Sequence, residues 1–140
     1  MKILEDVKNL LSPFFPNLNL EEVVLIDGSI SLGKVIMTLF GASAITFGDK
    51  IYFAERLDQS NFFNMALIGH ELVHVEQYKK RGMVRFLIRY LLEFVANLAI
   101  EKNCRRAYMT ISFEREAYQT EKMILDLLIP NKNSSLNDKT

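Results

Sequence analysis

The 140-residue chain has little of several features that would define a class of protein. It contains one cysteine, Cys104, so no intrachain disulfide can form and a reducing compartment is the simplest setting. Seventeen Lys and Arg balance seventeen Asp and Glu, so no net field draws in nucleic acid or an anionic membrane from a distance. No run of about 18 apolar residues predicts a membrane span. Residues 1–6 place acids where a signal peptide would be apolar, which favours a cytoplasmic protein.

The composition that remains is that of an ordinary globular domain. Apolar residues make up 49% of the chain and charged residues 24%, which excludes a mainly disordered chain. The length fits one core, so we expect a single domain over residues 1–130. Residues 131–140 are rich in Asn, Ser, Lys and Asp, and we expect them to form a disordered tail.

The first half of the chain predicts one helix and a small sheet. Apolar residues at helical spacing predict a helix over residues 2–11, and a short apolar run predicts a strand over 23–26. Residues 31–41 are ambiguous and fit a helix. Residues 44–47 and 51–53 predict two strands around the hairpin loop 48–50. The strand at 50–54 is the candidate for pairing with an extended peptide, and the alternative is an ordinary strand of the sheet.

The second half predicts three long helices. The first runs over residues 62–81, with cations in its last turn and Gly82 beyond it. Residues 83–100 predict a central core helix with one polar stripe, and the less favoured alternative is a helix lying on a membrane or a partner. The last runs from residue 112 or 113 to 128. Together these elements predict an α+β fold, with a small sheet packed on a helical layer.

The residues that carry chemistry lie inside the helix predicted over 62–81. Residues 70–74 read His70-Glu71-Leu-Val-His74, and residues four apart share one helical face, so both imidazoles can reach one metal ion. Glu71 is rotated by about 100° from His70, so it can flank a metal-bound water as a general base without binding the metal. Imidazole nitrogens suit Zn²⁺, and a catalytic zinc takes three protein ligands and a water. The pattern therefore predicts a zinc site with Glu71 as its base.

The third ligand has to come from elsewhere, because the two histidines of this motif are the only ones in the chain. Residues 113–118 read Phe-Glu-Arg-Glu-Ala-Tyr, and this downstream Glu together with residues 67–77 resembles the gluzincin metallopeptidases. The Phe-Glu-x-x-Ala spacing is similar to that of membrane-associated CAAX-type proteases. Over residues 40–125 the chain more closely resembles a small bacterial peptidase-like family of unknown function. The resemblance implies a minimal zincin-like fold with Glu114 as third zinc ligand, and Glu116 is the alternative.

Other side chains are candidates for supporting roles. Related enzymes often place an Asp where this chain has Tyr118, and Gln77 could replace it by orienting His74 from one turn further along the helix. Tyr118 is also a candidate donor to an oxyanion, although core packing is the favoured role for the tyrosines. Cys104 could ligate zinc, but a buried free thiol is the favoured interpretation.

The leading hypothesis is a zinc metallopeptidase that hydrolyses peptide bonds with a metal-activated water. The alternative is a catalytically weak or inactive zinc-binding module that acts as an accessory protein for a partner, because the short chain leaves little room for a deep cleft. The expected partner is a peptide or protein substrate rather than nucleic acid. Membrane association is not favoured, and the sequence does not define an oligomeric state.

Overall fold

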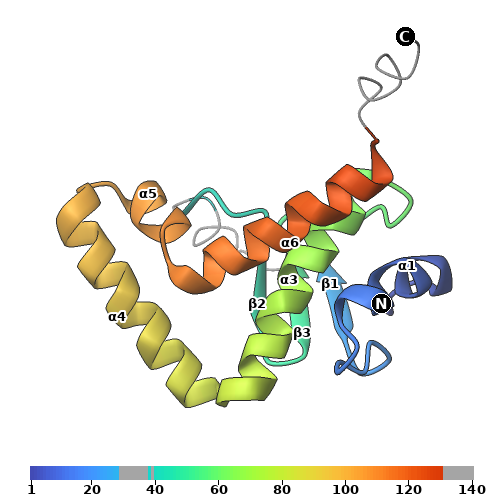
Figure 1. The fold of residues 1–140 in the computed structure, drawn as a ribbon, viewed down its shortest axis with the longest axis horizontal. Coiled ribbons are helices and arrows are strands. Elements are labelled where there is room, and N and C mark those ends of the chain that lie inside the picture. Colours follow the sequence, from blue (N-terminus) through green and yellow to red (C-terminus); the bar gives the residue numbers. More distant parts are fainter. Residues whose placement is uncertain (29–37, 39, 131–140) are drawn as a thin grey trace, which may run out of the picture.

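Three short strands form a mixed sheet in the computed structural model, which describes residues 1–28, 38 and 40–130 (Figure 1). The strand order is β1-β3-β2, so β3 is central, parallel to β1 and antiparallel to β2. The strands are β1 (Val24–Asp27), β2 (Ala44–Phe47) and β3 (Lys50–Phe53). The fold class is α+β, as the sequence predicts.

The predicted hairpin is confirmed, but its role as a strand acceptor is wrong. Gly48 has a φ of 66°, a left-handed conformation that glycine adopts without steric cost, and it turns β2 into β3. Because β3 is paired on both sides, its backbone cannot accept another strand. Among the described strands, β1 and β2 form the edges of the sheet.

One face of the sheet packs against helix α3 (Phe62–Arg81). Residues along β2 alternate, with Ala44 and Thr46 buried and Ile45 and Phe47 exposed. The buried face joins α3 in the main apolar core. This packing fixes which side of α3 faces the sheet and brings β2 beside the residues at 70–74.

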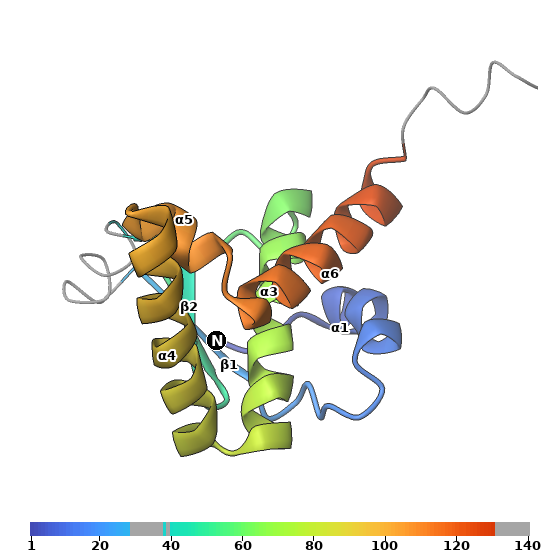
Figure 2. The same ribbon diagram turned by 60° about the vertical axis from the view of Figure 1, so that its left-hand side comes forward.

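The other helices surround α3, and their bounds test the sequence predictions. Figures 1 and 2 show α3 and α6 crossing, with α1 and α4 on opposite sides. The helices at 62–81 and 112–128 are confirmed, whereas the short α5 was not predicted. The residues predicted as helix at 31–41 and as tail at 131–140 lie almost wholly outside the described residues, and the single domain over 1–130 stays a prediction. The remaining elements are α1 (Glu5–Leu11), η1 (Ser12–Phe14), α4 (Met83–Glu101), α5 (Cys104–Met109) and α6 (Ser112–Leu128).

The start and end of α3 have the expected local chemistry. The Asn61 side chain accepts hydrogen bonds from the backbone N–H groups of Phe63 and Asn64, which satisfies two donors at the helix start. Gly82, with a φ of 80°, ends the helix and turns the chain into α4. These boundaries set the helical phase that places residues 70, 71 and 74.

A glycine allows α6 to approach α3 closely. A Cβ atom built on Gly69 would lie 2.2 Å from Cδ1 of Ile124, which is fully buried on α6. Any side chain at position 69 would therefore displace Ile124. The close crossing brings the beginning of α6 towards the histidines of α3.

The prediction that residues 83–100 form a central core helix is wrong. Helix α4 is present, but Phe86 is its only buried residue. Its inner face packs on a small cluster that includes Tyr78 and Phe113, while its outer face is exposed, because α4 lies at the edge of the molecule (Figure 2). Among the helices that the structure describes, none combines the length and the hydropathy needed to cross a bilayer.

Candidate metal centre

Helices α3 and α6 bring two histidines and one carboxylate together. His70 Nε2 lies 3.2 Å from Glu114 Oε2, and His74 Nε2 lies 3.3 Å from Glu114 Oε1. All three residues are buried. The two histidines lie one turn apart on α3, and Glu114 is in the first turn of α6. Residues about 40 positions apart in the sequence thus form one group.

The spacing of these atoms fits a metal ion. One ligand atom from each of His70, His74 and Glu114 lies within 4.8 Å of the other two. Two bonds of about 2.0–2.1 Å in tetrahedral geometry place their ligand atoms about 3.3 Å apart, which is close to the two nitrogen–oxygen distances above. The group could therefore hold a metal ion, and two imidazoles with one carboxylate form a ligand set that Zn²⁺ accepts.

The second ring nitrogen of each histidine has a partner that orients the ring. His70 Nδ1 donates to Glu121 Oε2 at 2.8 Å, and His74 Nδ1 donates to Gln77 Oε1 at 2.9 Å. These bonds leave Nε2 of both rings facing Glu114. Partners of this kind fix the orientation and tautomer of metal-binding histidines.

Glu116 supports the site from outside the group. Its side chain is exposed, and its Oε2 accepts a hydrogen bond from Gln77 Nε2 at 2.8 Å. Gln77 Nε2 also donates to the backbone carbonyl of Phe113. Glu116 therefore anchors the glutamine that orients His74, while Glu114 is the α6 carboxylate that faces both histidines.

Aromatic side chains enclose the group. Tyr90 of α4 donates a hydrogen bond of 2.7 Å from its hydroxyl to Glu114 Oε1. The Tyr118 ring meets the His70 ring edge to face, with 4.6 Å between centroids. The Phe86 ring is 6.3 Å from that of His74. Helix α4 thus covers one side of the group and holds one oxygen of Glu114.

Glu71 is buried beside the histidines and faces the sheet. Its Oε2 accepts a hydrogen bond of 2.6 Å from Thr46 Oγ1 on β2. Glu71 and His70 also line one cavity of about 100 Å³. Glu71 is therefore held in one orientation, beside the group and next to a space large enough for water.

The charges in the group are strongly coupled. Burial lowers the pKa of His70, but hydrogen bonds to Glu114 and Glu121 outweigh it and raise that pKa to about 10. Burial also lowers the pKa of His74, and the Glu114 charge reverses the direction. Burial raises the pKa of Glu71 and of Glu114, but the two histidines hold the pKa of Glu114 well below its usual range. Protons on the imidazoles balance the carboxylates, and a divalent cation could take the place of those protons.

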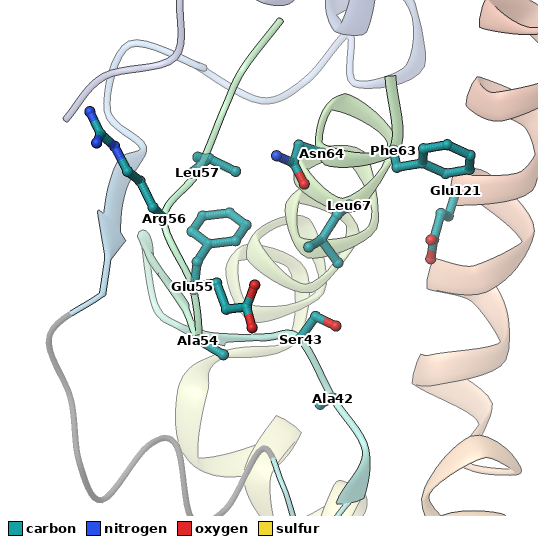
Figure 3. Close-up of a pocket in the computed structure, with 11 residues that line it drawn as sticks. Ala42, Ser43, Ala54, Glu55, Arg56, Leu57, Phe63, Asn64, Leu67 and Glu121 are labelled. Carbon is teal, nitrogen blue, oxygen red and sulfur yellow. The ribbon is translucent and has the colours of Figure 1, made fainter. Parts of the chain in front are cut away.

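A larger cavity adjoins the smaller one. It measures about 570 Å³, and the two share Ala42, Ser43, Leu67 and Glu121 in their walls. Figure 3 shows the Glu55 and Glu121 carboxylates on opposite sides of this space. The group is thus buried, and the smaller cavity beside it adjoins one of the size that small ligands occupy.

Sequence reasoning missed three partners of the site. Glu121 follows Glu114 by seven residues, so two helical turns place both on one face of α6, and this spacing could have revealed it. Tyr90 and Thr46 come from other elements, and no local spacing relates them to residues 70–74. Cys104 is exposed at the start of α5, so the expectation of a buried thiol is wrong, and it does not belong to the group.

Comparison with known proteins gives one family. The eCIS core domain, named for extracellular contractile injection systems, matches residues 6–82, which is more than half of the chain. The match covers α1, the sheet and α3 with both histidines, and it ends before α4. No curated protein and no solved structure matches the chain.

Proposed function

Because the chain belongs to the eCIS core domain family, we propose that it is a metal-binding accessory protein of an extracellular contractile injection assembly. The observation that carries the proposal is the buried group of His70, His74 and Glu114. Two of these residues lie inside the family match and the third lies beyond it. The bound metal would therefore fasten the C-terminal helix α6 to the family core.

The donor set favours zinc as that metal. His70, His74 and Glu114 would hold it, with Glu121 and Gln77 fixing the two rings. When bound, zinc would crosslink α3 to α6 and would also supply Lewis-acid chemistry. The buried carboxylates would then be balanced without protonated histidines.

Zinc uptake by metal-free protein tests the site. We expect stoichiometric zinc in the wild type, measured by competition with a chromophoric chelator, and loss of binding in His74→Ala and Glu114→Gln. Asp126→Asn is the matched control, since it removes one negative charge from the same helix at an exposed position outside the group. At a free zinc concentration 100 times Kd, zinc should stabilise the fold by about 2.7 kcal/mol. Equal zinc affinity of wild type and Glu114→Gln would contradict the site.

Association with the injection assembly tests the accessory role. We expect the tagged chain to co-purify with contractile injection particles when both are expressed together, and His74→Ala to be lost from them. Particles that form and fire normally without any bound chain would contradict this role, and that result would leave the zinc measurement unaffected.

The second candidate function is a zinc metallopeptidase, and the position of Glu71 favours it. Glu71 is buried, oriented by Thr46, and shares the smaller cavity with His70. A carboxylate there can take a proton from an attacking water and return it to a leaving amine. A buried carboxylate base next to a space for water is the feature that supports this second candidate.

Glu71→Gln separates the two functions. The variant keeps the three proposed ligands, so it should bind zinc like the wild type. If the chain is a peptidase, the variant should lose cleavage of a degenerate peptide library by about 10²-fold or more. Equal cleavage by both proteins would exclude Glu71 as the base, and no cleavage by either would leave the accessory role as the function.

A further inference from the structure

Helix α4 presents an apolar face that the protein itself does not cover. Five aliphatic side chains on it are between 55% and 69% exposed. At 100° per residue they fall within an arc of about 100°, opposite to the buried Phe86. These five residues, here called the α4 face, are Val84, Ile88, Leu91, Leu92 and Val95. A contiguous exposed apolar surface of this kind marks an interaction site.

Net positive charge is concentrated in the segment of the chain that contains α4. Residues 79–106 hold eight cations and two acids, a net charge of +6, although the whole chain is neutral. The other 112 residues therefore carry −6. Cations lie at both ends of α4, and Arg85 lies beside its apolar face, whereas Arg89 lies over the Phe113 ring. The occupant of the face is therefore expected to be negatively charged.

Some of these cations are available to an occupant, whereas the Arg81 guanidinium lies 5.1 Å from the centroid of the Phe113 ring and the Arg105 side chain lies against Gly41. Lys79, Lys80 and Arg89 each form an ion pair with an acid of the chain. No ion pair is found for the other five among the residues that the structure describes, and all five are exposed. These five are Arg81, Arg85, Lys102, Arg105 and Arg106.

A second copy of the chain fits the α4 face poorly. Both ends of α4 are cationic, so parallel and antiparallel pairing would each place cations against cations. Like charges opposed at an interface cost binding free energy. The face also carries no hydrogen-bonding side chain to define a register with a protein partner.

From these observations we propose that α4 lies in the plane of an anionic lipid bilayer. The α4 face enters the boundary between headgroups and acyl chains, and the flanking cations contact anionic headgroups. The helix is about 28 Å long and lies flat, because its inner face remains packed on the domain. This inference goes beyond the accessory function and does not depend on it.

Co-sedimentation of the full chain with vesicles tests the proposal. We expect binding to phosphatidylcholine vesicles that contain about one-third phosphatidylserine, and much weaker binding to pure phosphatidylcholine. Added salt should release the protein, because it screens the headgroup charge. Wild type that stays in solution with anionic vesicles, or that binds both kinds equally, would overturn the proposal.

Surface variants assign the binding to α4. Leu91→Gln should weaken partitioning about tenfold or more, and Arg85→Gln about fivefold. The matched controls are Leu127→Gln and Lys122→Gln on α6, whose side chains are also exposed. Circular dichroism should show the same helix content in all four variants. Equal losses in variants and controls would overturn the assignment.

Light scattering without vesicles distinguishes the rival occupants. We expect the wild type to be monomeric at concentrations where it binds vesicles. A dimer that Leu91→Gln dissociates would assign the face to a second copy and overturn the lipid proposal. The same conclusion would follow if an acidic protein of the injection assembly bound the face and no vesicle did.

Discussion

The crossing of α3 and α6 at Gly69 predicts a measurable coupling between two buried positions. In Gly69→Ala the new Cβ would lie 2.2 Å from Ile124 Cδ1, whereas carbon atoms in good contact are about 3.5–4.0 Å apart. Ile124→Val removes that same Cδ1 atom. Each change alone should destabilise the protein, and the two together should largely compensate.

The magnitudes follow from opposing terms. Alanine gains about 1 kcal/mol over glycine in a helix, and overpacking a core costs about 1–3 kcal/mol. Gly69→Ala should therefore destabilise by about 1 kcal/mol. Ile124→Val should cost about 1 kcal/mol as a buried methylene is lost. In the double variant the methyl group introduced at position 69 fills the vacated space and the helix gain remains, so its stability should be near that of the wild type. The coupling free energy is then about 2 kcal/mol.

Urea denaturation of the four proteins measures this coupling. The same titration with saturating zinc would report whether the shifted crossing changes the metal group. Gly69→Ala combined with Leu127→Val is the control, because Leu127 is exposed on α6 and its loss frees no space at Gly69. Single-variant effects that add to within about 0.5 kcal/mol would refute the reasoning, since they would show that the two positions do not compete for space.

Three further predictions concern groups that position the site. Tyr90→Phe removes the hydrogen bond to Glu114 and should weaken zinc binding about tenfold in a chelator competition, and unchanged affinity would contradict this role. Asn61→Ala removes the cap of α3 and should lower the free energy of unfolding by about 1 kcal/mol in urea, where an unchanged midpoint would argue against capping. Glu93 accepts two hydrogen bonds from Ser112 at the start of α6, so Glu93→Gln should cost about 1 kcal/mol at pH 7. Burial raises the pKa of Glu93, but the bonds from Ser112 and Arg89 lower it below 4.5, so this contribution is present above that pH and disappears as pH falls through the lowered pKa. A difference between Glu93→Gln and wild type that stays constant down to acid pH would contradict it.

Local patterns predicted most of the secondary structure. Helix α3 was predictable at both ends because Asn61 and Gly82 have backbone requirements that a sequence displays. The strands of the hairpin were predictable for the same reason. The order of the strands in the sheet was not predictable. It depends on the pairing of β1 with β3, and the residues of neither strand specify which strand it pairs with.

The error over α4 has a physical cause. A helix rich in aliphatic residues has the composition of a core helix, and burial depends on which other elements reach it. The apolar pattern predicts a helix, and a helix is found, but only the face with Phe86 packs against other parts of the domain. Sequence alone could not decide between a buried helix and one that keeps an apolar face for something else.

Some residues of the candidate site could be predicted from the sequence, and others became apparent only in the structure. His70, Glu71 and His74 could be found because their spacing on one helix is the feature that defines the site. Glu114 could be predicted only from the resemblance to a known family, because it lies 40 residues beyond His74 along the chain. Tyr90 became apparent only with the fold, since the packing of α4 on α6 brings it to the carboxylate.

Helix α4 contacts Glu114 of the candidate metal group on its inner side and is exposed on its outer side. It can therefore link metal binding to binding at the outer face. Tyr90 holds a carboxylate of the group, Glu93 holds the first residue of α6, and Leu91 and Leu92 between them point outwards. A reagent that tilts this helix would pull on both anchors. If zinc binding and an occupant of the outer face are coupled through α4, thermodynamic reciprocity requires that each change the affinity for the other by the same factor. Helix α4 would then couple metal binding at its inner side to ligand binding at its outer face.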